Sequence, residues 1–458
     1  MTTVPTDGPQ LAMSRWSPPT CSSAESRLFR LLRLMTLSPG HFHAALVQKR
    51  ALHGVHHRTH VYAPLDADTF AHLARVASFN NRPDRPTSWE IDLRAGPEYL
   101  ARFVQEQPGN AVVLSGRNRP KIDLMHLCAS NCLHVIADKP WIIDHADFPK
   151  LEALLREAEL RDALLWDVLT ERFEITNWLQ RELTRDADLF GTWQVGTPSH
   201  PALRLRSVHY LKKTVSGRPL VRPWWWFDPE ISGEAMADVG THLADLSMWL
   251  IAPEQVIDYA TQVQMLAADR SPLLLTQEQF GTLTGLAAFP PELRPYLTEG
   301  NLYYAGNNSA TYTLRGVHVK LETEWEYEST VGGDTHECVA RGTKATISVR
   351  QPPGARPELF VAATDPADHA QTVERLRDRC DSLPRDFAGM SILDLGTEAQ
   401  VLIPDAWRAT HEDHFAAVMD EFVRYFHTPR AVPAWERPNA LARYYITTKA
   451  VEMARVRL

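Results

Sequence analysis

Residues 111–140, AVVLSGRNRPKIDLMHLCASNCLHVIADKP, contain two short apolar runs on either side of a helix-length segment. The first run, at 111–114, consists of alanine, valine and leucine, which is typical of a strand buried on both faces. Residues 120–132 have the length of a crossover helix, and residues 133–137 form the second apolar run. A strand, a helix and another strand in this order predict a right-handed parallel βαβ unit.

The same alternation extends over residues 28–163, which predicts a Rossmann-like parallel sheet there. Residues 1–27 are rich in proline and serine without hydrophobic periodicity, so we expect a disordered leader. Within 164–458, segments such as 310–329 and 336–350 are rich in valine, threonine and tyrosine, which favours antiparallel strands. The predicted fold class is α/β, with an N-terminal dinucleotide-binding domain and then an α+β domain for substrate binding and oligomerisation. The largely antiparallel sheet of that second domain is expected to have one open face.

Asp138, Lys139 and Pro140 follow the second strand of the βαβ unit. In open α/β sheets, ligands bind outside the carboxyl ends of the strands. Lys139 lies at such an end, and Pro140 restricts the backbone beside it. The sequence therefore predicts that Lys139 faces a ligand.

A second polar cluster lies in residues 233–245, GEAMADVGTHLAD. Asp238 precedes His242 by four residues and Asp245 follows it by three, so on a helix the three side chains share one face. A carboxylate can orient an imidazole and leave its other nitrogen free for a substrate proton, which suits general acid–base catalysis. The structural alternative is that His242 only bridges neighbouring segments.

Together these motifs resemble the glucose-fructose oxidoreductase and inositol dehydrogenase family (Gfo/Idh/MocA). That family has a glutamate-lysine-proline motif after a Rossmann strand, which corresponds here to DKP at 138–140. It also has a later glycine-rich segment with aspartate and histidine four apart, which corresponds to Asp238 and His242. Residues 170–173, TERF, resemble the signature that opens the family's second domain. Shorter stretches at 38–48, 213–217 and 414–418 resemble one uncharacterised branch with its own C-terminal domain.

The resemblance implies hydride transfer between a nicotinamide cofactor, NAD or NADP, and a secondary alcohol. It places Lys139 near the nicotinamide and hydrogen-bonded to the reacting oxygen, while His242, held by Asp238, exchanges the proton. The residues expected at the cofactor are Ser38, Gly40, His41, His43, Ser115, Asn118, Asp138 and Pro140. The residues expected at the substrate are Arg172, Lys213, Trp225 and Asp245.

Trp225 belongs to the aromatic segment RPWWWFD at 222–228. Tryptophan faces stack well on sugar rings, which favours a substrate contact. The alternative is that these aromatic residues pack a loop against the core or a partner subunit, because aromatic residues dominate both.

The turn after the first strand departs from the dinucleotide pattern. A Rossmann turn of the form G-x-G-x-x-G brings the backbone close to the cofactor pyrophosphate. At 38–43 the sequence is SPGHFH, so Gly40 is retained while Ser38 and His43 replace the outer glycines. A helix is expected to follow at 43–52. The second strand carries no acidic residue at its end, so the sequence does not decide between NAD and NADP.

Composition excludes several classes of protein. A formal net charge of -8 is unlike the basic footprint of a nucleic-acid-binding protein, and no apolar run approaches the length of a membrane span. Five cysteines, an odd number without metal-type spacing, predict reduced thiols and a cytoplasmic protein. Six histidines between residues 41 and 60 show no recognisable ligand spacing, so no metal site is predicted.

The leading functional hypothesis is a nicotinamide-dependent oxidoreductase acting on a sugar, cyclitol or related polyol. A first alternative is an enzyme of the same fold that uses bound NAD transiently to cleave glycosidic bonds. A second is a non-catalytic dinucleotide-binding or regulatory protein, which the altered turn favours. The expected partners are a small-molecule substrate and further copies of the chain, since an open sheet face needs cover.

Overall fold

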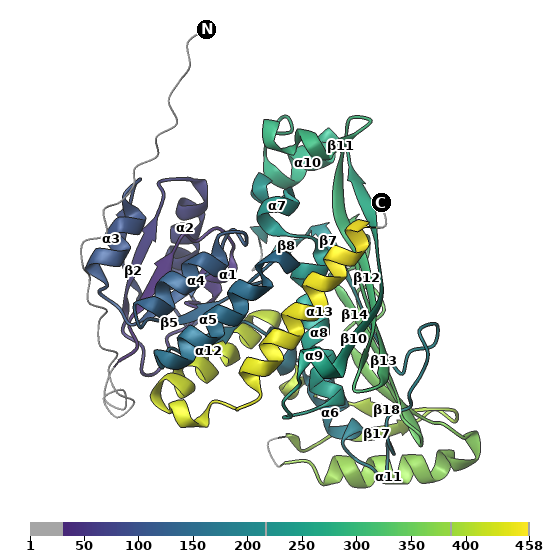
Figure 1. Cartoon of the computed structure of the whole chain (residues 1–458). Helices are drawn as coiled ribbons and strands as arrows, with labels where there is room; N and C mark the ends of the chain where they lie inside the picture. Colours follow the sequence, from purple (N-terminus) through teal and green to yellow (C-terminus); the bar gives the residue numbers. More distant parts are fainter. Residues whose placement is uncertain (1–30, 216–217, 385–386, 457–458) are drawn as a thin grey trace.

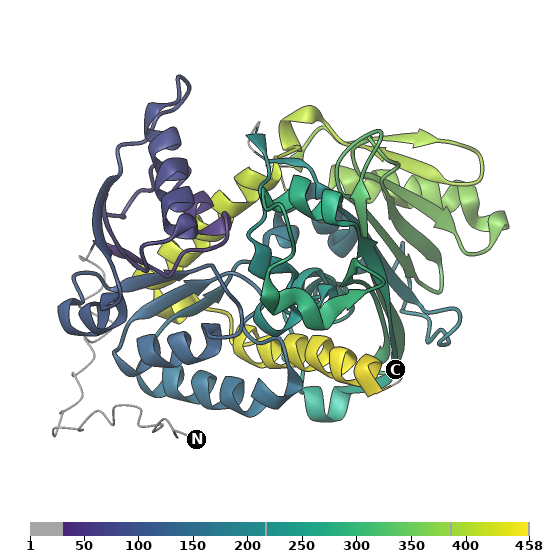
Figure 2. The ribbon, with the colours of Figure 1, turned by 90° about the horizontal axis from the view of Figure 1, so that it is seen from above.

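The computed structural model describes residues 31–215, 218–384 and 387–456, arranged in two halves that lie side by side (Figures 1 and 2). The predicted leader at 1–27 lies outside the described residues, as do Ser216 and Gly217. The N-terminal half contains a parallel sheet of six described strands in the order β3-β2-β1-β4-β5-β6. This order reverses direction beside β1, which gives the topological switch point of a Rossmann-like sheet.

The strands of this half are β1 (Leu34–Leu37), β2 (Arg58–Ala63), β3 (Glu90–Ala95), β4 (Ala111–Leu114), β5 (His134–Ala137) and β6 (Leu165–Asp167). Its helices are α1 (His43–Leu46), α2 (Ala67–Asn81), α3 (Tyr99–Glu106), α4 (Lys121–Ser130) and α5 (Phe148–Leu160). The βαβ unit predicted from residues 111–137 is confirmed as β4, α4 and β5. Ala111 pairs with His134 in parallel register, and β4 is buried along its whole length.

The helix expected at 43–52 is wrong in length, because α1 ends at Leu46. The chain continues in tight turns, with the Gln48 N–H donating to the Ala45 carbonyl at 2.9 Å. A later helix of the chain, α12 (His411–His427), packs against α1. Phe415 and Phe422 of α12 belong to the same buried cluster as strand β1. Packing by a distant helix has overridden the local helical pattern.

Strand β6 adds to β5 in parallel, with Val135 opposite Leu165. The predicted boundary between residues 163 and 164 therefore separates β6 from the sheet to which it is hydrogen-bonded. We place the end of the N-terminal sheet after Asp167 instead.

The second half is built on a mixed, mostly antiparallel sheet of ten described strands. Its strands are β7 (Leu203–Lys212), β10 (Val263–Leu275), β11 (Leu297–Thr298), β12 (Asn301–Leu314), β13 (Val317–Glu328), β14 (Thr335–Arg341), β15 (Ala345–Arg350), β16 (Glu358–Ala363), β17 (Ser391–Asp394) and β18 (Ala399–Leu402). A separate hairpin is formed by β8 (Thr214–Val215) and β9 (Arg218–Pro219). The helices are α6 (Ile175–Thr184), α7 (Pro229–Ser232), α8 (Ala235–Ile251), α9 (Tyr259–Gln262), α10 (Gln277–Thr284), α11 (His369–Asp381), α12 and α13 (Glu436–Val456). Among the described strand pairs of this sheet, β7 with β13 is parallel and the others are antiparallel.

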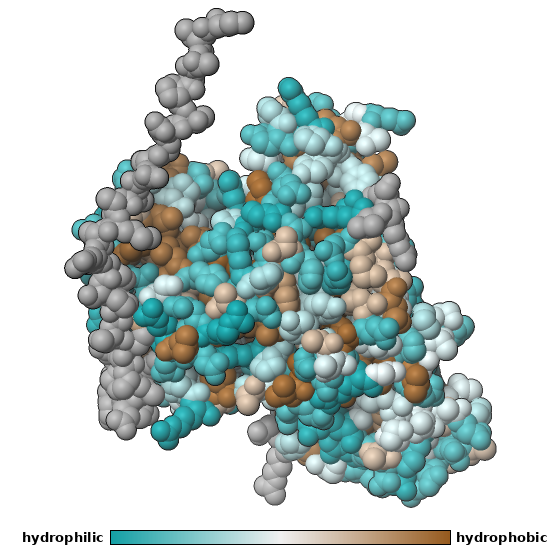
Figure 3. Space-filling model, viewed as in Figure 1, coloured by the Kyte–Doolittle hydropathy of each residue, from teal (hydrophilic) through white to brown (hydrophobic). Residues whose placement is uncertain are grey.

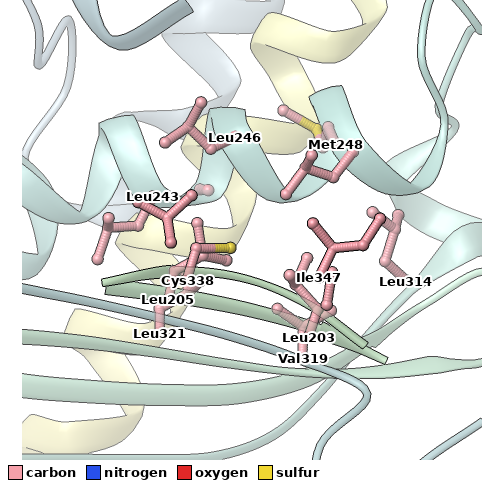
Figure 4. Packing of buried hydrophobic residues seen from close by; sticks show 14 of the residues in the cluster. Leu203, Leu205, Leu243, Leu246, Met248, Leu314, Val319, Leu321, Cys338 and Ile347 are labelled. Carbon is pink, nitrogen blue, oxygen red and sulfur yellow. The ribbon is translucent and has the colours of Figure 1, made fainter. Parts of the chain in front are cut away.

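Helix α8 is buried between the large sheet and α13. Figure 4 shows Leu243 of α8 above Leu205 and Cys338 of the sheet, and these residues share one hydrophobic cluster. Helix α13 packs against α8, β10 and α5, so it joins the two halves. Burial of α8 on several sides explains why its sequence is apolar around most of its circumference.

The opposite face of the large sheet is polar. Arg206 on β7 pairs with Glu324 on β13 at 2.7 Å, and Arg204 pairs with Glu322 beside it. Such cross-strand ion pairs keep this open face hydrated. The side of the whole molecule seen in Figure 3 is largely hydrophilic, with hydrophobic residues scattered between the polar ones.

Two further expectations can be compared with the described residues. None of their helices is long and apolar enough to cross a membrane. Cys128, Cys338 and Cys380 are free buried thiols, whereas Cys132 is disulfide-bonded. The expectation that the cysteines are all reduced is therefore wrong for Cys132.

Candidate active site

A cleft of about 850 Å³ lies where the carboxyl end of the parallel sheet meets α8, β7 and α12. Its polar lining combines both halves: His41, His43, Lys139, Glu171, His209, Lys213, Arg222, Asp238, His242, Asp334, His336 and His411. A volume of this size falls within the range of small-molecule sites, about 300–1,000 Å³.

Lys139 and Asp238 are joined in this cleft. The ammonium group of Lys139, just beyond β5, donates a hydrogen bond to a carboxylate oxygen of Asp238 in the first turn of α8. Burial opposes the charge on Asp238, but the nearby Lys139 outweighs it and leaves the pKa of Asp238 below its ordinary value. Asp238 is therefore ionised at neutral pH.

His242 lies on the same helix and lines the same cleft, but the predicted contact with Asp238 is wrong. Within the described residues, Nδ1 of His242 is buried without a hydrogen-bond partner. Asp238 instead bonds to Lys139, which sequence spacing could not reveal because that lysine comes from the other half. Burial first, and then the charge of Lys139, hold the pKa of His242 well below 6.5, so the imidazole is neutral.

The eight residues expected at a cofactor do lie together at the edge of the parallel sheet. Ser115 donates to Asp138 at 2.6 Å, and Asn118 accepts from Lys121 at 2.8 Å. Lys121 Nζ also donates to the Pro140 carbonyl at 3.0 Å. These contacts make one connected polar network, in which Lys121 is a buried residue that sequence reasoning missed.

The glycine turn itself does not fit a dinucleotide in this conformation. The backbone N–H groups of Gly40 and His41 donate to the Ser115 carbonyl at 3.0 and 3.2 Å, so they do not point to a pyrophosphate. A Cβ on Gly40 would lie 3.0 Å from Cζ2 of Trp225, which covers the turn. The cavity between this turn and α8 measures about 20 Å³, far below the volume of a nicotinamide site.

Trp225 is held over the turn by two contacts. Its indole N–H donates to Asp68 at 2.8 Å, and the guanidinium of Arg117 lies 5.5 Å from its ring centroid. Trp225 is 3% exposed and lines the small cavity rather than the large cleft. Trp225 therefore lies at the sheet edge where the cofactor was expected, and not in the large cleft where it was predicted to contact substrate.

Two histidines and an aspartate meet beside the turn. Nδ1 of His41 lies 3.3 Å from Oδ2 of Asp138, and Nδ1 of His43 lies 3.4 Å from the same oxygen. Lys121 binds the other oxygen of this carboxylate at 2.6 Å. Burial opposes the charge of Asp138, but Lys121 and the histidines keep its pKa well below 3.8.

Lys213, which was predicted to contact substrate, lines the large cleft. Its ammonium group is hydrogen-bonded to Asp334, which also contacts Nδ1 of His209 at 2.9 Å. Arg222 lies nearby, 5% exposed and stacked on Trp226 with 4.2 Å between guanidinium and ring centroid. Lys213, Asp334, His209 and Arg222 thus form one polar part of the cleft wall.

Arg172 and Asp245 do not reach this cleft, contrary to prediction. The guanidinium of Arg172 makes two hydrogen bonds of 2.7 Å to Asp245, which also accepts from Arg443 at 2.8 Å. Arg443 in turn binds Asp167 at 3.1 Å. Both predicted residues are thus tied into a buried network between β6, α8 and α13, and Arg172 faces a separate cavity of about 550 Å³.

Sequence reasoning also missed Glu171, Asp334 and His411 in the cleft. Glu171 directly precedes Arg172 in the TERF stretch, so its position there was a usable signal. Burial, with a smaller contribution from Glu174, raises the pKa of Glu171 to about 7. Asp334 and His411 arrive from a loop before β14 and from α12, and no local pattern marks them.

Comparison with known proteins shows that the chain is similar to oxidoreductases. The family model described as "Putative oxidoreductase C terminal domain" matches residues 179–455. A solved structure of a "putative oxidoreductase" from Parabacteroides merdae is 36% identical, covers 93% of this chain and 98% of its own, and superposes with a TM-score of 0.90. No curated protein sequence matches the chain.

More distant structures share the fold alone. An oxidoreductase from Agrobacterium radiobacter, in complex with NAD+, L-tartaric acid and magnesium, is 12% identical with a TM-score of 0.55, covering 93% of this chain and 96% of that one. KijD10, a 3-ketoreductase from Actinomadura kijaniata in complex with NADP and TDP-benzene, is 13% identical with a TM-score of 0.54, covering 93% and 98%. With the Rossmann-like half, the DKP segment and the matched C-terminal domain, the chain belongs to the Gfo/Idh/MocA family of oxidoreductases.

Proposed function

We propose that this oxidoreductase interconverts a secondary alcohol and a ketone on a sugar, cyclitol or related polyol, with NAD or NADP as cofactor. The observation that carries the proposal is that Lys139, Asp238 and His242 line one cleft at the carboxyl end of the Rossmann-like sheet. Distant structural neighbours in complex with NAD+ and with NADP support the cofactor class.

Each of these residues has a role that its environment supports. Lys139 is a hydrogen-bond donor for the reacting oxygen, and its hydrogen bond to Asp238 orients it. His242 is a neutral imidazole that lines the cleft, so it accepts a hydroxyl proton or returns it. Lys213, paired with Asp334, and the guanidinium of Arg222 line the same cleft and are available to bind substrate hydroxyls.

Binding of the dinucleotide requires a rearrangement at the sheet edge. In the conformation described, Trp225 lies over Gly40, and the backbone amides of the turn are used internally. We therefore propose that the indole of Trp225 swings away from Gly40 before the cofactor binds.

The first experiment is a titration of the purified chain with NADH and with NADPH, followed by nicotinamide fluorescence and by thermal shift. We expect saturable binding of one of them. A screen of sugars and polyols with the oxidised cofactor should then show accumulation of reduced cofactor. Cleavage of a glycoside without such accumulation would favour the glycosidase alternative, and absence of binding by either nucleotide would favour the regulatory one.

Variants then test the residue roles. His242→Gln and Lys139→Ala should each lower turnover by at least about 100-fold, the usual scale for a lost general acid or base, with little change in nucleotide affinity. Lys150→Met, on the exposed surface of α5, is the matched control. Unchanged turnover in both cleft variants would exclude the assigned roles.

We also propose a homo-oligomer that pairs through the open face of the large sheet. The half-buried arginine and glutamate residues of that face support a polar interface. Light scattering of the purified chain would give the number of subunits.

A further inference from the structure

We propose that His41, His43 and Asp138 form a binding site for one divalent transition-metal ion, such as Zn²⁺ or Co²⁺, at the rim of the cleft. The site goes beyond the proposed function, which needs no metal. It uses the turn where a dinucleotide fold ordinarily has its glycines.

Two of the three distances between the ligand atoms suit such an ion. The two imidazole Nδ1 atoms lie 3.3 and 3.4 Å from the same carboxylate oxygen, and all three ligand atoms lie within 4.8 Å of one another. With metal–nitrogen and metal–oxygen bonds of about 2.0–2.2 Å, neighbouring ligands of a tetrahedral ion lie about 3.3–3.5 Å apart. The two distances to Asp138 already meet this spacing.

The imidazole of His43 provides an independent indication. His43 is 8% exposed, and its Nδ1 has no hydrogen-bond partner among the described residues although a carboxylate oxygen lies 3.4 Å away. A buried polar atom without a partner is costly, so it calls for an explanation. A metal ion between His43 and Asp138 would satisfy this nitrogen.

The surroundings of Asp138 resemble the outer ligand sphere of a metal site. Lys121 holds Oδ1 at 2.6 Å and Ser115 donates to Oδ2 at 2.6 Å, so the carboxylate is fixed in place before any ion arrives. Such outer partners orient metal ligands and sharpen their affinity. His41 and His43 are also held against each other, with ring centroids 3.9 Å apart.

The remaining coordination position would face the cleft. His41 and His43 both line it, and Lys139 and Asp238 lie on its adjoining wall. Three protein ligands with an open position are the arrangement of catalytic rather than structural zinc sites. Imidazole nitrogens with one carboxylate oxygen favour zinc, cobalt or iron over calcium or magnesium.

The experiment measures metal binding directly, without substrate or nucleotide. The full chain, freed of any affinity tag and dialysed against a chelator, is titrated with Co²⁺ and followed by visible d–d absorption, with metal analysis of the saturated protein. We expect one equivalent of Co²⁺ in a distorted tetrahedral spectrum, displaced by Zn²⁺. His41→Ala and His43→Asn should each weaken binding by at least about 100-fold, because loss of an outer-sphere partner alone costs about 10–100-fold.

His336→Asn is the matched control. His336 also lines the cleft and has a buried, unpartnered ring nitrogen, but it lies outside the cluster, so its replacement should leave Co²⁺ binding unchanged. Circular dichroism establishes that each variant is folded. Absence of Co²⁺ binding in the wild-type chain, or equal binding in folded His41→Ala and His43→Asn, would overturn the proposal. Nucleotide binding is scored separately, so failure of the metal site and failure of the oxidoreductase proposal give different results.

Discussion

The side chain of Lys139 donates a hydrogen bond to Asp238, and this ion pair joins the end of a Rossmann-like strand to the first turn of a helix in the other half. The two residues are 99 positions apart in the chain. The side chain of Lys139 is 9% exposed and that of Asp238 is 24% exposed, and the nearby Lys139 lowers the pKa of Asp238. The pair therefore couples the arrangement of the two halves to the chemistry of the cleft.

Replacement of Asp238 by asparagine should affect both activity and stability. We expect turnover to fall by at least about 100-fold, because Lys139 loses the carboxylate that orients it. The free energy of unfolding should fall by about 2–3 kcal/mol, below the range for a fully buried pair because Asp238 is partly exposed. Urea unfolding and steady-state kinetics measure the two effects. Glu326→Gln, at an exposed site on β13, should change neither, and wild-type turnover in Asp238→Asn would contradict the coupling.

Replacement of Trp225 by alanine should open the cofactor edge. The indole N–H bond to Asp68 and the contact with Gly40 are then lost, so a nucleotide no longer has to displace the ring. A hydrogen bond to a charged group is worth about 1.5–3 kcal/mol, which corresponds to a gain in NADH affinity of roughly 10-fold or more. Calorimetric titration of Trp225→Ala beside Trp224→Ala would measure it. Equal binding by Trp225→Ala would show that the indole does not obstruct the nucleotide, and weaker binding would show that it supports it; either result contradicts the proposed rearrangement.

Replacement of Arg443 by methionine should destabilise the fold although Arg443 does not line the cleft. Arg443 is 1% exposed and binds both Asp167 and Asp245, so its loss leaves two buried carboxylates with fewer partners. We expect a loss of about 3–5 kcal/mol in the free energy of unfolding. Arg437→Met, on the same helix with its side chain 42% exposed, should cost less than about 1 kcal/mol. Similar unfolding curves for the two variants would contradict the importance of this network.

The pH dependence of stability should carry a contribution from Glu171. Its pKa is about 7 in the folded chain, raised first by burial, against an ordinary value of 4.5. Between these values the folded state binds more protons than the unfolded state, so this contribution to stability falls as the pH rises from 4.5 to 7. The loss is at most about 3 kcal/mol.

Glu171→Gln removes this ionisation. The stability of the variant relative to wild type should therefore increase between pH 4.5 and pH 7 and level off above it, as measured by urea unfolding at a series of pH values. A difference that stays constant across this range would mean that Glu171 titrates normally.

The elements that the sequence predicted well are those with a strong local pattern. Strand β4 begins and ends at the residues expected from its apolar run, and α8 covers the segment that carries Asp238 and His242. A continuous apolar run is enough to predict β4, because a strand that is buried on both faces is apolar at nearly every position. The helix predicted at 43–52 was wrong in length because its extent depends on a distant element: α12 packs against this part of the chain, and α1 ends at Leu46.

The sequence by itself determined the Rossmann-like half, the α+β half, the family and the residue types of the site. Only the tertiary structure decided which side chains meet: Lys139 with Asp238, Arg172 with Asp245, and Trp225 with Gly40. Periodicity is a property of neighbouring residues, so it fixes helices, strands and their buried faces. The partner of a charged or aromatic side chain is fixed by how distant elements pack, and this packing cannot be inferred from the spacing of residues along the chain.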